Sequence, residues 1–226
     1  MRNRESIVGK GSEMGKLFQL DSPIVTFFTK TGELILLDIC WLIGCVPIVT
    51  IGTSCTALYY AVAKSIRRDT GYPVQEFFRS YKSNLKRGTA ASVLFLLLGF
   101  ALYFNREVAA NTIAAAGIAG VVVYDGILAV LAGILLYLFP VLSRFSFRLA
   151  EGLKLSFVMV IRFLPVTAVI LAGTVIVFRF WAYYLPIPLI LVLPAAWCYL
   201  LSFFMEKALL KFMPKPEEGS NEWYYN

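Results

Sequence analysis

Two carboxylates lie inside apolar stretches of this sequence, where a charged group is rare. Asp38 stands within Leu34–Trp41, and Asp125 follows Tyr124 within Val121–Gly126. A carboxylate inside a membrane helix is costly and usually faces the interior of the bundle. Such a group could hold a proton or a cation, or accept hydrogen bonds from a sugar. The plainer alternatives are pairing with polar or basic groups for Asp38 and exposure to water for Asp125.

Hydroxyl side chains follow in the segment Cys45–Tyr60, which is uncharged and contains Pro47 and Gly52. Thr50 and Thr53 could help a helix N-terminus to hold an anion or a sugar. The alternative is helix capping by these threonines together with close helix packing on a face of small residues. The pattern favours packing.

Basic residues gather in two segments between apolar runs. The first, residues 73–87, places aromatic residues on one helical face and basic residues on another, which is typical of a helix lying in the membrane interface. The second, residues 144–157, repeats this pattern. Candidate contacts to anionic lipid or to a soluble partner are Arg79, Lys82, Lys86, Arg87, Arg144 and Arg148. Lipid anchoring is favoured over docking of a partner.

The residue types exclude most familiar chemistry. The chain has no histidine, and its four cysteines form no Cys-x-x-Cys pair, so we expect no metal site and no catalytic triad. Nucleotide-binding glycine motifs are also missing, and no cofactor is expected. Although the net charge is +7, the basic residues flank apolar runs, which indicates anionic lipid rather than nucleic acid. We therefore expect a protein that is not an enzyme.

The elements that would position these residues are membrane helices. The chain has 226 residues, of which 59% are hydrophobic and 15% charged, more apolar surface than a soluble domain of this size can bury. We expect an all-α membrane helix bundle as a single domain over residues 17–206, between polar tails at 1–16 and 207–226. The apolar runs cover residues 34–48, 53–66, 89–105, 117–142, 158–178 and 187–205.

Two topologies are open. Six spans would form three helical hairpins joined by the two basic segments, whereas five spans would leave residues 53–66 on the surface. With six spans and both termini inside, only Arg106 and Arg179 of the 21 basic residues lie outside, as the preference for basic cytoplasmic flanks requires. Six spans are favoured, although the short second span would require Lys64 to extend to the interface.

Three sequence features resemble a known family. These are Pro47-Ile48-Val49-Thr50-Ile51-Gly52, the segment Phe77–Lys82, and Leu138–Phe145 followed by Arg162-Phe163-Leu164-Pro165. They are similar to the YesL-like bacterial membrane family, domain of unknown function 624. The resemblance implies a bacterial plasma-membrane protein associated with ATP-binding-cassette sugar importers. It carries over no catalytic residue.

We therefore expect a non-catalytic accessory or interaction component of a carbohydrate-uptake system. A small transporter or channel that uses the intramembrane carboxylates is the alternative. Membrane lipids and importer subunits are the expected partners, and self-association into a homo-oligomer is left open.

Overall fold

The computed structural model describes residues 23–111, 115–145, 148–184 and 193–212, and these residues form helices joined by short turns without a strand. This confirms the all-α prediction for the described part of the chain. The helices are α2 (Pro23–Cys45), η1 (Ile48–Thr50), α3 (Ile51–Ala61), the π-helix η2 (Val62–Ile66), α4 (Pro73–Ala110), α5 (Ala115–Arg144), α6 (Leu149–Arg162), α7 (Leu164–Tyr184) and α9 (Leu193–Leu210). The predicted N-terminal tail and most of the C-terminal tail lie outside the described residues.

Three of the described helices are long and apolar enough to cross a membrane: α4, α5 from Gly117, and α9. A fourth span is possible if α6 and α7 act together, although they meet at an angle of 97°. A polytopic membrane protein is thus supported, but the predicted count of six spans is not confirmed. Helix α2 is continuous but carries three charged residues, Lys30, Glu33 and Asp38. Helix α3 has 11 residues, fewer than the roughly 20 that a crossing needs.

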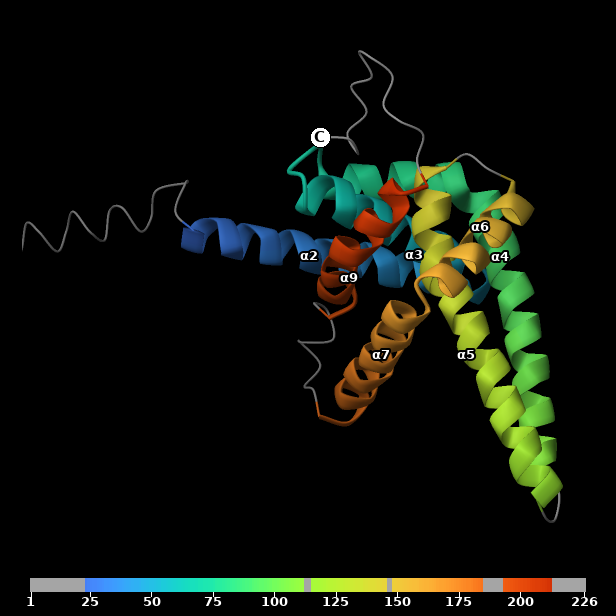
Figure 1. The fold of residues 1–226 in the computed structure, drawn as a ribbon. Coiled ribbons are helices and arrows are strands. Elements are labelled where there is room, and N and C mark those ends of the chain that lie inside the picture. Colours follow the sequence, from blue (N-terminus) through green and yellow to red (C-terminus); the bar gives the residue numbers. More distant parts are fainter. Residues whose placement is uncertain (1–22, 112–114, 146–147, 185–192, 213–226) are drawn as a thin grey trace, which may run out of the picture.

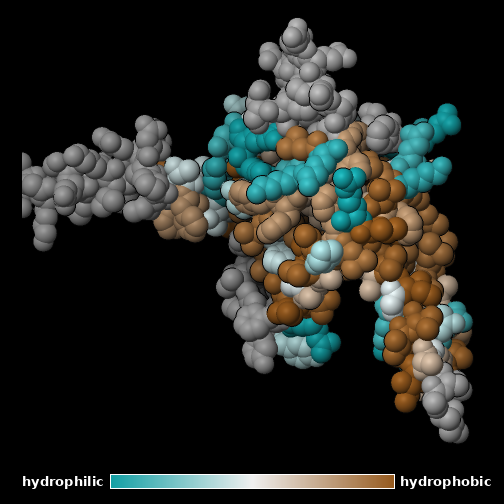
Figure 2. Space-filling view, in the orientation of Figure 1, coloured by the Kyte–Doolittle hydropathy of each residue, from teal (hydrophilic) through white to brown (hydrophobic). Residues whose placement is uncertain are grey.

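The helices are arranged around a long hairpin formed by α4 and α5 (Figure 1). The first part of α4 runs across one end of the molecule, and the remainder extends away from it beside α5. Helix α2 lies crosswise to this hairpin, whereas α7 and α9 run more nearly along it. Hydrophilic residues gather over the end where α4 begins and again near the far ends of α7 and the hairpin, with hydrophobic surface between them (Figure 2).

Helix α3 lies at the centre of the packing, against α2, α4, α5 and α9. It crosses α4 so closely that a Cβ atom added to Gly88 would lie 2.5 Å from Thr53 Oγ1 and 2.6 Å from Thr53 Cα. The Gly52 amide donates a hydrogen bond to Ser92 Oγ at 2.7 Å across the same crossing. Glycine at these positions lets the two backbones approach to a distance that larger residues would prevent.

The two basic segments differ in part from the interfacial helices predicted. Residues 73–87 are the beginning of the continuous helix α4, and Phe77 there is fully buried against α3 rather than facing lipid. Phe77 also stacks on Tyr81, with ring centroids 6.1 Å apart. In the second segment, α5 continues to Arg144 and a separate helix, α6, begins at Leu149. The sequence pattern thus placed Phe77 in the membrane interface, whereas tertiary packing buries it against another helix.

Candidate functional site

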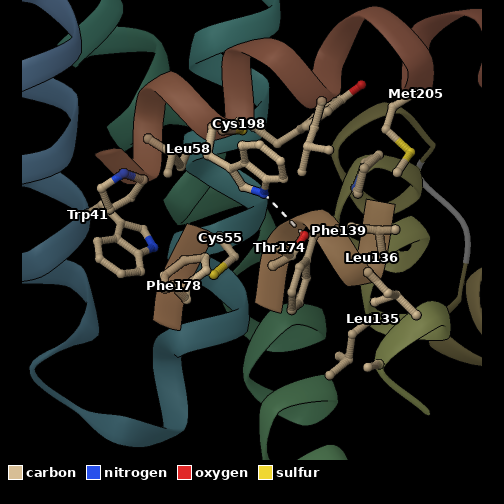
Figure 3. A pocket seen from close by; sticks show the side chains of 17 residues that line it. Trp41, Cys55, Leu58, Leu135, Leu136, Phe139, Thr174, Phe178, Cys198 and Met205 are labelled. Carbon is tan, nitrogen blue, oxygen red and sulfur yellow. Dashed lines mark hydrogen bonds between the residues drawn. The ribbon is translucent and has the colours of Figure 1, made fainter. Parts of the chain in front are cut away.

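An apolar cavity of about 330 Å³ lies between α2, α3, α5, α7 and α9 (Figure 3). Aromatic and aliphatic side chains make most of its wall, among them Trp41, Phe139, Phe178 and Trp197. The Trp197 indole donates a hydrogen bond to Thr174 Oγ1 at 3.2 Å, which fixes α9 against α7. No carboxylate or basic side chain lines the described wall, so the cavity suits an apolar group rather than acid–base chemistry.

Asp38 lies beside this cavity but does not line it. Its side chain is fully buried, and both carboxylate oxygens accept a hydrogen bond from the Ala195 amide, at 2.9 and 3.1 Å. Ala195 is the third residue of α9, where backbone amides have no partner within their own helix. Asp38 therefore caps α9 from a different helix, which corresponds to the plainer of its two predicted roles, pairing with a polar group.

Asp125 lies on the α4–α5 hairpin and is not brought near Asp38. Its Oδ1 accepts a hydrogen bond from Arg106 Nε at 2.7 Å, and its side chain is half exposed. The same guanidinium contacts Glu107 at 2.8 Å. The two predicted carboxylates thus belong to separate interactions and form no shared proton or cation site.

Thr50 and Thr53 both act within the packing of α2, α3 and α4. The Thr50 hydroxyl is shared between the carbonyl oxygens of Gly44 at 2.8 Å and Pro47 at 2.7 Å, which closes the turn after α2. Thr53 Oγ1 lies 3.4 Å from Leu85 O and 3.3 Å from Thr89 Oγ1 on α4. Both hydroxyls therefore have partners in the protein, as the packing alternative requires.

Sequence reasoning missed a buried ionic cluster around Glu206 on α9. Glu206 Oε1 accepts hydrogen bonds from Tyr59 Oη at 2.8 Å and from Arg144, while Oε2 lies 3.5 Å from Arg68. Nearby, Arg67 donates to Ser202 O at 2.7 Å. The only sequence signal was an acidic residue at the end of the last apolar run. Burial lowers the pKa of the Arg68 guanidinium, although the Glu206 carboxylate opposes this effect.

The cluster corrects the prediction for Arg144. Its side chain is only 1% exposed and is paired with Glu206, so it cannot serve as a lipid or partner contact at the surface. The expectation that Lys64 extends to the interface is also corrected, because its ammonium lies 2.8 Å from the nearly buried carboxylate of Glu76. Both cations are held by acidic residues from a different helix.

The other predicted basic contacts divide into two groups. Lys82, Lys86 and Arg148 are exposed, and the Arg79 side chain is 75% exposed with Glu76 3.9 Å away. Arg87 is partly buried and donates to Phe145 O at 3.2 Å and to Asn84 Oδ1 at 2.9 Å. Arg87 therefore fastens α4 to the end of α5, while the exposed side chains are accessible to lipid or protein.

Comparison with known proteins gives one family match. The family described as "Protein of unknown function, DUF624" matches residues 34–106, which run from the middle of α2 to near the end of α4. No curated protein and no solved structure showed significant similarity to the chain. The matched segment holds Asp38, Thr50, Thr53 and the α3–α4 crossing. The predicted resemblance to this family is thereby confirmed by the match over residues 34–106.

Proposed function

We propose that this protein is a non-catalytic accessory or interaction component of a bacterial carbohydrate-uptake system in the plasma membrane. The observation that carries the proposal is the exposed basic surface at the polar end of the molecule, formed by Arg79, Lys82 and Lys86 of α4 with Arg148 at the start of α6. These side chains project from a packed helical scaffold, as a docking surface for an acidic partner or for lipid headgroups requires. The link to sugar import comes from the family resemblance.

The proposed orientation puts this polar end, and both termini, on the cytoplasmic side. Helices α4, α5, the α6–α7 pair and α9 run alternately away from and back toward that end (Figure 1). Four such crossings return the chain to its starting side, and crossing by α2 and α3 as a further hairpin would leave this result unchanged. The enrichment of Lys and Arg on cytoplasmic flanks favours the basic end as the inner one.

The alternative, a small transporter or channel that uses Asp38 and Asp125, has less support. Asp38 is occupied by the Ala195 amide and Asp125 by Arg106. A carboxylate that binds a transported ion or sugar must exchange such a partner for the substrate during each cycle. Flux through proteoliposomes that is lost in both Asp38→Asn and Asp125→Asn would restore this alternative.

The proposed function is tested by purification of the full chain from its native membrane in a mild detergent. We expect importer subunits to copurify with the wild type and to be lost when Lys82→Glu and Lys86→Glu are combined. The matched control is Arg179→Glu, which reverses an exposed charge on α7 and is expected to leave copurification unchanged. Recovery of the wild type without any importer subunit, in repeated preparations, would overturn the proposal.

A further inference from the structure

A second, smaller cavity lies where the chain bends between α6 and α7. Its volume is about 160 Å³, and it is enclosed by α5, α7 and α9 around the bend. Tyr137, Val166, Ile170 and Met205 form an apolar wall, while Lys207 of α9 and Lys211, directly after that helix, line the same cavity. An apolar slot with two cations is a different kind of site from the uncharged cavity beside Trp41.

The bend that creates this cavity is held by specific contacts. Pro165 follows directly after the break and has no backbone N–H to continue the helical hydrogen bonds. The Thr167 hydroxyl lies 3.0 Å from Phe163 O and 2.9 Å from Tyr137 Oη, and both Thr167 and Tyr137 are buried. These contacts fix the start of α7 to α5. The bend between α6 and α7, and the cavity beside it, are therefore held in place by specific hydrogen bonds.

Two cations line the cavity, and a third lies at the same joint. Lys207 is in the last turn of α9 and Lys211 directly follows its end. Lys211 Nζ lies 5.3 Å from the centroid of the Phe163 ring. The Arg162 guanidinium lies 5.6 Å from the Phe212 ring at the same joint. Among the described residues, no carboxylate lies within ion-pair distance of these three cations. Glu206, the neighbour of Lys207, is engaged by Tyr59, Arg68 and Arg144.

We propose that this joint binds one anionic phospholipid, with part of an acyl chain in the apolar slot and the phosphate against Lys207, Lys211 and Arg162. A free phosphate would satisfy the cations alone and leave the apolar wall without an occupant. Basic pockets between membrane helices are known to select anionic headgroups, and here the cations and the slot form a single site. The inference does not depend on the proposed function, because it concerns α6, α7 and α9 rather than the basic surface of α4.

The test measures lipid binding to the purified full chain in a neutral detergent. Phosphatidylglycerol and phosphatidylcholine are supplied in equal amounts, and bound lipid is counted by native mass spectrometry. We expect one phosphatidylglycerol to be retained in preference to phosphatidylcholine. Removal of both cations by Lys207→Gln with Lys211→Gln should weaken phosphatidylglycerol binding by about 25-fold, which is roughly fivefold for each lysine.

The control is Arg179→Gln, which removes an exposed cation from the far part of α7, and it should change the affinity by less than about twofold. Val166→Trp, which places a large side chain in the partly exposed slot, should reduce retention while leaving the cations in place. Equal retention of both lipids, or a loss of affinity in Arg179→Gln equal to that in the lysine double variant, would overturn the proposal. Displacement of the lipid by stoichiometric inorganic phosphate would also overturn it, because the site would then bind a free anion.

Discussion

At the scale of single residues, the buried charges of this protein are engaged in holding helices together. Asp38 of α2 caps the start of α9, and Glu206 of α9 receives Tyr59 from α3 and Arg144 from α5. Each contact joins helices that are far apart in the sequence. The buried carboxylates of Asp38 and Glu206 thus both find hydrogen-bond partners within the protein, as low-dielectric surroundings require.

Removal of the Glu206 charge should be strongly destabilising. Glu206→Gln leaves Arg144 and Arg68 without their buried counter-charge, and loss of one partner of a buried ion pair typically costs about 3–5 kcal/mol. We expect a clear drop in the thermal unfolding temperature of the detergent-purified protein, measured by circular dichroism. The control Arg79→Gln alters an exposed contact at 3.9 Å and should have little effect. Equal melting temperatures for wild type and Glu206→Gln would show that the cluster does not stabilise the fold.

The capping role of Asp38 predicts a difference between two substitutions. Asp38→Ala removes the acceptor for the Ala195 amide and should destabilise the protein by about 1–2 kcal/mol, as loss of a helix cap usually does. Asp38→Asn keeps a carbonyl oxygen that can accept this hydrogen bond, so its stability should remain near that of the wild type. Unfolding of the purified variants compares the two. If Asn proves as damaging as Ala, the negative charge rather than the cap is what the fold needs.

The sequence identified Asp38 as unusual but could not reveal its partner. The Ala195 amide is 157 positions away, and any backbone amide at a helix start could satisfy a carboxylate equally well. The same limit explains Arg144, whose sequence context resembles that of the exposed basic residues. Only the approach of α9 shows that Arg144 is buried against Glu206. Residue type thus predicts which groups need a partner, while the fold decides which partner they find.

At the scale of elements, the crossing of α3 and α4 organises the segment that matches the family. The crossing depends on Gly88, because a methyl group there would overlap the Thr53 backbone. The small-residue packing predicted around Thr53 is found in this contact. Where the structure describes them, the apolar runs lie mainly on helices, although the run at 158–178 is divided between α6 and α7 by a bend of 97°. Helix α2 begins at Pro23, a residue well suited to the first turn of a helix.

Gly88→Ala should force α3 and α4 apart and destabilise the protein by about 1–3 kcal/mol, the usual cost of overpacking. Gly99→Ala is the matched control in the same helix, since a Cβ there meets nothing within 4 Å. Alanine also favours a helix over glycine by up to about 1 kcal/mol, so this control should be neutral or slightly stabilising. Thermal unfolding of both variants gives the comparison. Equal stability of the two variants would contradict the close crossing.

The boundaries and membrane roles of helices were harder to predict than their existence. Residues 73–87 and 89–105 merge into α4 because Gly88 does not interrupt its hydrogen bonds. Helices α2 and α3 overlap the first two apolar runs. Hydropathy alone, however, does not specify whether a short helix crosses the membrane or packs beneath its surface. Their lengths and charges leave them outside the set of candidate spans. Packing against α4 and α9 decides their orientation, and that information is not local in the sequence.

At the scale of the whole molecule, polarity separates along the direction of the α4–α5 hairpin. Hydrophilic residues occupy the end where α4 begins and reappear near the far ends of α7 and the hairpin, with hydrophobic surface between them (Figure 2). This distribution matches the polar, apolar and polar layers of a bilayer. The charge count in the sequence favours the same orientation, because α4 carries Lys82 and Lys86 near its start and only Arg106 near its far end.

The most direct test of this account is the accessibility of the two ends of α4 in intact cells. Ser83 and Asn105 are both exposed and, at about 1.5 Å per residue, lie roughly 33 Å apart along the helix, close to the thickness of the hydrocarbon core. Each position is changed in turn, as Ser83→Cys or Asn105→Cys, in a background without the four native cysteines. A membrane-impermeant thiol reagent should label the Asn105→Cys protein in intact cells and the Ser83→Cys protein only after permeabilisation. Labelling of both in intact cells, or the reverse pattern, would contradict an α4 that crosses the bilayer with its basic end inside.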